Sequence, residues 1–219
     1  MNEPRVTLDY PWLVLDLGAP MRVLSWAINR PGFVTARRIV WREIRNADLP
    51  EGLDARDWLR RALADQGETD SVAFLTSRNI SRFRKAHARS GAAAAFVAAT
   101  VGLSNAERVG RRHRVRVDAY GTINVGAHLN LGLSETGLIE AMSIAVQART
   151  AAILDADIRA GRARATGTGT DCLAIADASG PANYAGLHTD VGEALGRAVY
   201  NAVRSGAEDW KTEQEKADA

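Results

Sequence analysis

The sequence predicts an α+β fold, a single domain in which a mixed β-sheet is covered by two or more long helices. Three observations lead to this prediction. The first half is rich in short β-type runs, the second half holds two long stretches with helical spacing of apolar residues, and no repeat or linker divides the chain. Apolar residues make up 46% of the 219, which is enough for a buried core. We expect one domain over residues 1–207 and a polar tail over residues 208–219 that frays.

The first half consists of candidate strands separated by turn signals. Gly18-Ala19-Pro20 separates two β-rich runs, and Asp54 begins a short helix that stops near Gly67. Residues 114–120 alternate apolar and polar side chains, as a half-buried strand does. Residues 92–103 begin in helix-tolerant alanines and finish as a β-type stretch. The extended segments expected over the whole chain are 12–17, 21–28, 33–44, 71–76, 114–120 and 172–177.

Two long helices are predicted in the second half. The first runs over residues 134–160, with Ser134 as its N-cap and Gly161 as its C-terminal stop. The second runs over residues 189–205 and ends at Gly206. In both, apolar side chains recur at the spacing that places them on one face, so both helices are expected to cover the sheet.

Charge and cysteine content narrow the function classes. A net charge of +2, from 28 basic and 26 acidic residues, is too balanced to indicate nucleic-acid binding. The single cysteine, Cys172, excludes an intramolecular disulfide and a Cys-rich zinc site, and with four scattered histidines we expect no metal site. The N-terminus has no signal pattern, and no run reaches the roughly 18 apolar residues of a membrane span. We therefore expect a cytoplasmic protein that does not bind membranes.

The basic residues nevertheless form local clusters. Such clusters on a near-neutral protein are solvated faces or sites for an anionic group. The three clusters are Arg37, Arg38, Arg42 and Arg45; Arg78, Arg82, Arg84 and Lys85; and Arg111, Arg112, Arg114 and Arg116.

The most unusual segment is ATGTGTD at residues 165–171, which we call the Thr-Gly loop. Alternating Thr and Gly suits neither a helix nor a strand interior. The loop offers the Thr168 and Thr170 hydroxyls, flexible backbone N–H groups and the Asp171 carboxylate within a few residues. It is either a plain glycine turn or a site that binds an anion or an oxyanion. No Gly-Lys-Ser/Thr follows, so it is not a P-loop.

A second candidate segment is YAGLHTD at residues 184–190. His188 precedes a helix start, where the helix dipole disfavours the imidazolium and leaves the neutral imidazole that a general base requires. The alternative is a histidine that only assists capping. Glu193, one turn into the helix, could orient it. Asp171 and His188 flank the same short strand, so we expect them to face one pocket.

Asparagines beside glycine mark two strand ends. Ser104 and Asn105 belong to GLSNA, and Asn124 ends GTIN. Short amide side chains suit a substrate rich in carbonyls and amides, although they also form turns. Cys172 follows Asp171 directly, and for it a small buried hydrophobe is the preferred interpretation over a nucleophile.

Taken together, these segments resemble the adenosylcobinamide amidohydrolase family, also called the CbiZ family. The resemblance spans residues 12–205 and is strong after residue 96. The family's Ser-x-Ala-x-Asn pattern is present at Ser25 and Asn29 without the glycines that usually follow. Its Glu-Ala-Lys reads Gln147-Ala148-Arg149 here, so we assign no catalytic carboxylate there. The matching stretches are TVGLSNA (100–106), GTIN (121–124), ARTAAILD (148–155), ATGTGTD (165–171) and YAGLHTDVGEALGRAVYNAV (184–203).

The resemblance implies hydrolysis of the amide that links an aminopropanol arm to the corrin ring of adenosylcobinamide or adenosylpseudocobalamin. Adenosylcobyric acid would be the corrinoid product. The corrinoid is the substrate and brings its own cobalt, so no separate cofactor is expected. A homo-oligomer is compatible with the sequence. The alternative is a non-catalytic corrinoid- or nucleotide-binding module, which would leave the amide intact.

Amide hydrolysis needs proton transfer and stabilisation of an oxyanion. We assign proton transfer to Asp171 and His188, with Glu193 in reserve. Trp12, Trp26 and Trp41 are core residues or an aromatic face for the adenosyl group. The expected substrate-binding residues are Ser104, Asn105, Asn124, Thr168, Thr170, Ser25 and Asn29.

Overall fold

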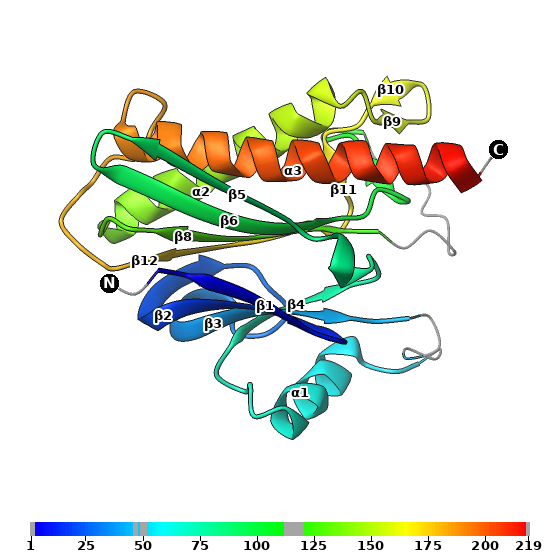
Figure 1. Ribbon diagram of the computed structural model, residues 1–219, viewed down its shortest axis with the longest axis horizontal. Coiled ribbons are helices and arrows are strands. Elements are labelled where there is room, and N and C mark those ends of the chain that lie inside the picture. The colour runs from blue at the N-terminus through cyan, green and yellow to red at the C-terminus, as the bar shows by residue number, and fades with distance from the viewer. Residues whose placement is uncertain (1–2, 46–47, 49–51, 112–120, 218–219) are drawn as a thin grey trace.

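The computed structural model describes residues 3–45, 48, 52–111 and 121–217. It confirms the α+β prediction, because an eight-stranded mixed sheet carries two long helices on one face (Figure 1). The helices are α1 (Ala55–Asp65), α2 (Glu135–Asp155) and α3 (Asp190–Ala217), with a 3-10 turn η2 (Ile80–Arg82). The strands of the main sheet are β1 (Arg5–Asp9), β2 (Trp12–Ser25), β3 (Gly32–Glu43), β4 (Val72–Thr76), β5 (Arg84–Ser90), β6 (Ala93–Val101), β8 (Ile123–Leu129) and β12 (Cys172–Asp177). Short strands form two small ribbons, β7 (Ala106–Glu107) with β11 (Gly167–Thr168), and β9 (Arg159–Ala160) with β10 (Ala163–Arg164).

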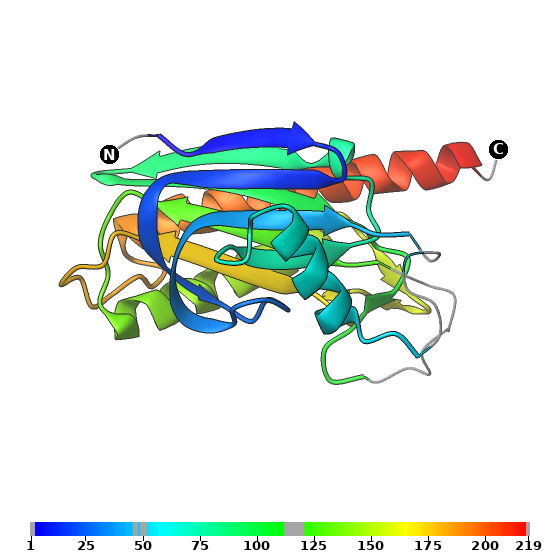
Figure 2. The ribbon, with the colours of Figure 1, turned by 90° about the horizontal axis from the view of Figure 1, so that it is seen from below.

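The two runs predicted before and after residues 18–20 are halves of the single strand β2. Its register with β3 shifts between Asp16 and Met21, so the glycine and proline there produce a bulge and a bend instead of a turn. Gly18 has φ 82°, a conformation that glycine adopts without strain. The first half of β2 pairs with β1 and the second half pairs with β12. The bend therefore directs β2 from one half of the sheet into the other (Figure 2).

Because of this bend, the sheet folds over on itself, in the strand order β4-β3-β2-β12-β8-β6-β5. Trp41 of β3 is fully buried inside the fold and packs edge-on against Phe74 of β4. A Cβ at Gly126 of β8 would lie 2.6 Å from the Trp41 ring, so this glycine leaves the space that the indole fills. Strands β3 and β8 are thus face to face across a shared core.

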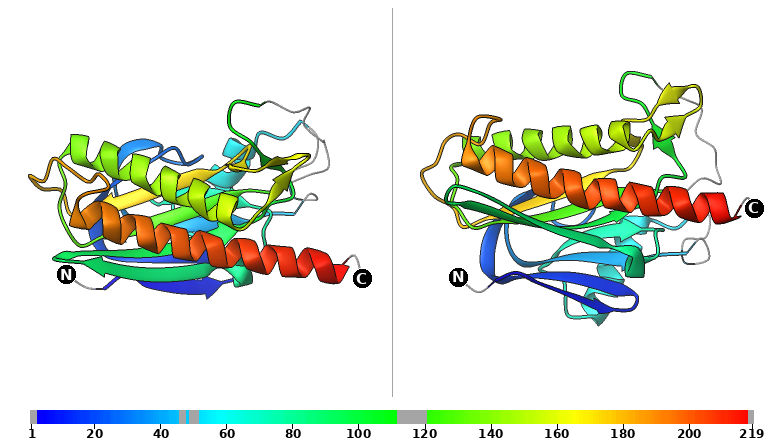
Figure 3. Two further views of the ribbon diagram at one scale, coloured as in Figure 1. Left: turned by 90° about the horizontal axis from the view of Figure 1, so that it is seen from above. Right: turned by 45° about the horizontal axis from the view of Figure 1, so that its top comes forward.

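Helices α2 and α3 cover β5, β6, β8 and β12 on the other face of the sheet (Figure 3). Ser134 caps α2 as predicted, since its Oγ accepts from Gly137 N at 3.1 Å. The helix ends earlier than predicted, at Asp155. Gly161 lies beyond it, with φ 59°, in the turn of the β9–β10 ribbon.

The predicted end of the last helix at Gly206 is wrong. α3 continues through this glycine to Ala217, and the residues expected to fray are its last three turns. A Cβ at Gly206 would lie 2.6 Å from Val101 of β6, so the missing side chain lets the helix approach the sheet instead of ending the helix. The same stretch also carries Trp210, which packs against the helix-side core.

The alanine-rich segment that starts at residue 92 is the strand β6 over most of its length. Ala95 and Ala99 lie under the helices, and Ala98 lies in the core on the other face of the sheet. A strand buried on both faces needs small side chains where a helix approaches closely, and this packing overrides the helix propensity of alanine. The predicted strand at residues 114–120, and the third arginine cluster beyond Arg111, lie outside the described residues.

By length and composition alone, α2 could cross a membrane. In this structure it is a layer of the fold. Leu138, Ala141 and Ala145 on α2 are fully buried in the core that it shares with the sheet and α3.

A buried ion pair organises the end of the sheet where β12 stops. Asp177 is fully buried, and its carboxylate accepts from Arg22 Nε at 3.0 Å and from Arg22 Nη2 at 2.8 Å. It also accepts from the backbone N–H groups of Leu133, at 2.7 Å, and Ser179. One carboxylate therefore joins β2 and β12 to the segment that leads into α2.

We predict that Asp177→Asn destabilises the protein by about 3 kcal/mol, because it leaves the Arg22 guanidinium largely buried without its counter-charge. Urea unfolding followed by circular dichroism measures the change. Asp65→Asn, at an exposed position of α1, is the control and should shift the free energy of unfolding by less than about 0.5 kcal/mol. Equal, small effects of the two substitutions would contradict this role of Asp177.

Candidate functional site

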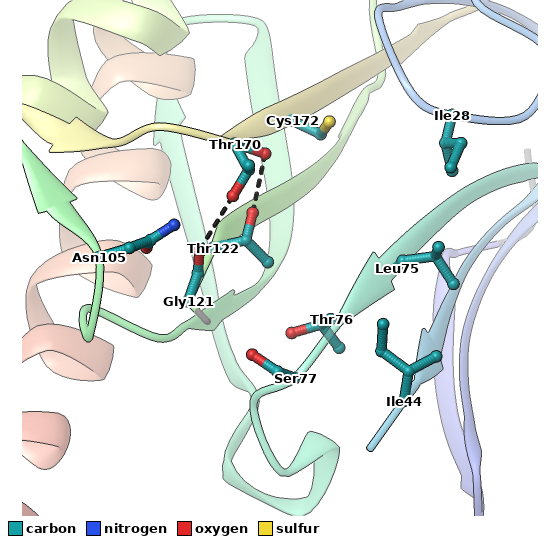
Figure 4. Close-up of a pocket in the computed structure, with 10 residues that line it drawn as sticks. All are labelled: Ile28, Ile44, Leu75, Thr76, Ser77, Asn105, Gly121, Thr122, Thr170 and Cys172. Atoms are coloured by element: carbon teal, nitrogen blue, oxygen red, sulfur yellow. Dashed lines mark hydrogen bonds between the residues drawn. The ribbon is translucent and has the colours of Figure 1, made fainter. Parts of the chain in front are cut away.

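A hollow of about 300 Å³ opens where β4 ends and where β8 and β12 begin (Figure 4). The topology explains why these segments meet. β8 and β12 are parallel, so both begin at one end of the sheet, and antiparallel β6 ends there. The described lining residues are Ile28, Ile44, Leu75, Thr76, Ser77, Asn105, Gly121, Thr122, Thr170 and Cys172.

Three of the predicted polar segments meet at this hollow. Asn105 comes from the segment after β6, Thr122 from the start of β8, and Thr170 from the Thr-Gly loop. Two hydrogen bonds join the last two segments, because Thr122 Oγ1 donates to Thr170 O at 2.9 Å and Thr170 Oγ1 donates to Gly121 O at 2.9 Å. The hydroxyls therefore hold one wall of the hollow together.

Of these residues, Asn105 has the least complete set of hydrogen bonds. Its Oδ1 atom is buried and receives no hydrogen bond from the part of the chain that the structure describes. A Cβ at Gly121 would lie 2.8 Å from this oxygen, so the glycine is needed for the side chain to pack where it does. Figure 4 shows the Asn105 amide nitrogen directed toward Thr170. Leaving a buried acceptor unpaired costs about 1–3 kcal/mol. Because this oxygen is closed off from solvent, the Asn105 amide has to turn toward the hollow before a ligand donor can pair with it.

Asp171 fixes the Thr-Gly loop from behind the hollow. Its carboxylate accepts from the backbone N–H groups of Thr168, at 3.0 Å, and Ile123, at 3.1 Å, and from Thr168 Oγ1 at 2.5 Å. Arg149 of α2 lies 2.9 Å from the same carboxylate and donates to Thr166 O at 2.6 Å. A Cβ at Gly167 would collide with both charged groups. Gly167 therefore makes room for the ion pair between Arg149 and Asp171.

The electrostatics of Asp171 suit a positioning role. Burial raises the pKa of the Asp171 carboxyl, while the Arg149 charge and the donors from Thr168 and Ile123 oppose that rise. Both oxygens already accept hydrogen bonds, and the side chain is turned toward α2. Asp171 is not among the described residues that line the hollow, whereas its neighbours Thr170 and Cys172 are.

The Cys172 thiol is protonated at neutral pH. Burial, together with the adjacent Asp171 carboxylate, raises its pKa to about 11. Because the thiolate is the reactive form of cysteine, this environment agrees with the preference for an unreactive side chain over a nucleophile. The expected full burial is wrong, since Cys172 is half-buried and lines the hollow.

Four other predicted substrate-binding residues have structural partners. Asn124 is buried, donates to Leu75 O at 2.8 Å across the folded sheet and lies next to the hollow. Ser25 accepts from Ala27 N, and Asn29 donates to Ser71 O, so both shape the corner after β2. Thr168 is bonded to Asp171, as described above. The fifth, Ser104, is exposed and does not belong to the described lining.

The prediction that Asp171 and His188 share a pocket is wrong. They lie beyond opposite ends of β12, a strand of six residues that extends roughly 16 Å at 3.3 Å per residue. Figures 1 and 3 show the segment after β12 at the far end of the sheet. His188 is exposed there and lines a shallow hollow with Glu140, Gln147 and Tyr184. The two residues flank the same strand, so they are close in sequence but lie far apart in space.

Glu193 does not take the predicted place beside His188 either. Its carboxylate accepts from Ser90 Oγ at 2.8 Å and pairs with Arg197 one turn along α3. Half of its side chain is exposed. These contacts make it a surface residue that joins α3 to the end of β5.

Three tryptophans were expected to be either core residues or an aromatic face for the adenosyl group. Of these three, only Trp26 lies at the surface near the hollow. Trp41 and Trp12 are core residues, and Arg42 lies over the Trp12 ring at 5.4 Å. Trp26 is 42% exposed, and its Nε1 donates to Asp171 O at 2.6 Å. The Cys172 thiol contacts Trp26 O, so the indole stands beside the cysteine wall of the hollow.

Sequence reasoning missed the β4 side of the hollow and Arg149. Thr76 and Ser77 follow a buried strand directly, a position where polar side chains meet others at a sheet edge, so a signal was present. Arg149 stands out in the sequence only as a departure from the Glu-Ala-Lys pattern. Its pairing with Asp171 joins segments more than 20 residues apart, and no local pattern predicts that contact.

The described lining of the hollow carries no charged side chain at neutral pH. The basic cluster next to it is largely paired, since Arg78 and Arg82 share Glu213 and Arg84 pairs with Asp209. Within the described ranges, no group of three or more His, Cys, Asp or Glu side chains is placed to hold a metal ion. The site can therefore bind a neutral polar group through hydroxyls and an amide.

Comparison with known proteins agrees with this chemistry. The family model described as adenosylcobinamide amidohydrolase (CbiZ) matches residues 2–215 of the 219. No curated protein matched the chain in a separate search. Because the family match covers nearly the whole sequence, the chain belongs to the adenosylcobinamide amidohydrolase family, hydrolases that act on a corrinoid amide.

Proposed function

We propose that the hollow beside the Thr-Gly loop is where this enzyme cleaves the amide between the aminopropanol arm and the corrin ring. The corrinoid product would be adenosylcobyric acid. The observation that carries the proposal is the buried Asn105 Oδ1 without a donor among the described residues, in a neutral hollow lined by hydroxyls. A corrinoid arm supplies an amide N–H donor and a carbonyl acceptor, and both match the two ends of the Asn105 side chain.

The size of the hollow favours binding of a corrinoid side arm over binding of the corrin ring itself. A volume of about 300 Å³ lies at the lower end for ligand pockets and suits one side arm. We propose that the ring rests outside the opening while the amide reaches Asn105 and Thr170. Ile28, Ile44 and Leu75 would then contact the hydrocarbon part of the arm.

Asn105 Nδ2 would donate to the carbonyl oxygen as negative charge develops on it. Such a donor stabilises the tetrahedral intermediate more than the substrate and so accelerates the reaction. The uncharged lining lowers the local polarity and strengthens this effect. A carboxylate product is less favourable there than a neutral amide, which would help release of adenosylcobyric acid.

We propose that proton transfer uses a group other than Asp171, His188 and Glu193. Cys172 is the one ionisable side chain in the described lining, and its raised pKa keeps it protonated. Asp171 is saturated by hydrogen-bond donors and His188 lies at the far end of β12. We propose that Asp171 supports the reaction by fixing Thr170. We propose no separate cofactor, since the cobalt belongs to the corrinoid.

We propose that Trp26 contacts the adenosyl group. Its exposed indole, held by the bond to Asp171 O, stands beside the wall of the hollow where a corrin ring would rest. A purine stacked on such a ring contributes about 1–3 kcal/mol. We propose that this contact selects the adenosylated corrinoid and helps to position the arm.

The first prediction from this proposal tests the site. Asn105→Ala should lower kcat/KM for adenosylcobinamide by about 100-fold, as loss of an oxyanion donor does, with the melting temperature nearly unchanged. Mass spectrometry of adenosylcobyric acid measures turnover. His188→Ala is the matched comparison and should keep near wild-type activity. Full activity of Asn105→Ala together with loss of activity in His188→Ala would indicate that the reaction takes place in the hollow lined by His188 instead.

The second prediction concerns the cysteine. Cys172→Ser should retain most turnover, and Cys172 should react slowly with a thiol-alkylating reagent at neutral pH, because its pKa is raised to about 11. The alkylation rate should climb as the pH rises toward that value, whereas the unfolded chain should react at the rate of an ordinary thiol. Inactivity of a folded Cys172→Ser variant would show that the thiol takes part in the chemistry.

The third prediction concerns selectivity. Trp26→Leu should reduce the preference for adenosylcobinamide over cyanocobinamide, measured as the ratio of their kcat/KM values, by about 5-fold or more if the stack contributes at least 1 kcal/mol. Tyr184→Leu removes an exposed aromatic ring at the far hollow and should leave the ratio unchanged. An unaltered ratio in Trp26→Leu would mean that the indole does not contact the adenosyl group.

A further inference from the structure

The last three turns of α3 contact the segment that forms the β4 side of the hollow. Arg78 follows Ser77 directly, and its guanidinium binds the Glu213 carboxylate through both terminal nitrogens, with Nη2 to Oε1 at 3.0 Å. Only 10% of the Arg78 side chain is exposed. A bidentate pair of this kind fixes direction as well as distance, because two parallel bonds define the plane of both groups.

Arg78 is joined to the lining on its other side. Its backbone N–H donates to Thr76 Oγ1 at 3.0 Å, so Ser77 is held between two anchored residues. The stem of Arg78 also lies against Gly102, whose own N–H donates to Thr122 O at 3.0 Å. One arginine thus contacts neighbours on both sides of the hollow.

Further ion pairs hold the same segment to the helix. Arg82 lies 3.3 Å from Glu213, and Arg84 pairs with Asp209 one turn earlier on α3. Hydrogen bonding and charge from Arg78, with the charges of Arg82 and Arg84, lower the pKa of the Glu213 carboxyl. Glu213 is therefore ionised at neutral pH. Trp210, packed against the core, keeps this part of the helix on the sheet.

We infer that Glu213 is a positioning residue for the hydrolysis, acting through Arg78 to hold Thr76 and Ser77 at the wall of the hollow. This inference rests on the proposed function, because it matters to catalysis only if the hollow is the site. The last turns of α3 would then fix the position of Thr76 and Ser77, which face Asn105 and the Thr-Gly loop across the hollow.

The test is the kinetics of Glu213→Gln with adenosylcobinamide, with Glu215→Gln as the matched control on the exposed face of the same helix. Glu213→Gln keeps the shape of the side chain and removes the charge. We expect kcat/KM to fall by about 10-fold, as misplacement of a positioning group does, while the pH profile keeps its shape. Glu215→Gln should match the wild type.

Two further variants separate positioning from loss of stability. Arg78→Lys keeps the charge and loses the bidentate geometry, so it should reproduce most of the defect. The double variant Arg78→Lys/Glu213→Gln should be no worse than either single one, because both remove the same contact. All rates are taken far below each variant's melting temperature, so that unfolded protein does not contribute.

Wild-type kcat/KM in folded Glu213→Gln would overturn the inference, as would equal losses in Glu215→Gln or additive losses in the double variant. The outcome for Asn105→Ala, measured alongside, keeps the two claims apart. If Asn105→Ala is impaired and Glu213→Gln is not, the site stands and the positioning role fails. If neither is impaired, the proposed site itself fails.

Discussion

The candidate site depends on the interactions of one buried group, the Asp171 carboxylate. It ties the Thr-Gly loop to the start of β8 through backbone N–H groups and to α2 through Arg149. Without that anchor, a loop of alternating Thr and Gly has no intrinsic preference for one conformation. Thr170 and Cys172, on either side of Asp171, face the hollow because Asp171 faces the helix. A charge that does not line the hollow therefore determines its shape.

The two ends of β12 have different roles in the molecule. At one end Asp177 and Arg22 form a buried pair that joins strands to the segment before α2. At the other end the parallel strands β8 and β12 begin and polar groups are presented to a ligand. Both ends use a buried carboxylate that accepts backbone N–H groups, yet only the second lies beside a hollow with an unsatisfied acceptor, Asn105 Oδ1, among the residues that the structure describes.

Local patterns predicted the elements better than the contacts between them. The Ser134 cap and the strand 172–177 could be predicted because each rests on neighbouring residues. The helix end predicted at Gly206 is wrong, since a glycine that lets a helix approach a sheet looks the same in sequence as one that ends a helix. Asn105 and the Thr-Gly loop were each named from the sequence as substrate-binding, whereas the pairing of Asp171 with Arg149 depends on tertiary structure alone.

The central claim is that the scissile amide is bound beside Asn105 and the Thr-Gly loop. The most direct measurement is a crystal structure of the Asn105→Ala variant with adenosylcobinamide bound. We predict the aminopropanol arm inside the hollow, its amide next to residues 105 and 170, and the adenosyl group against Trp26. An arm bound instead against His188 and Glu140, with the hollow beside the Thr-Gly loop unoccupied, would contradict the claim.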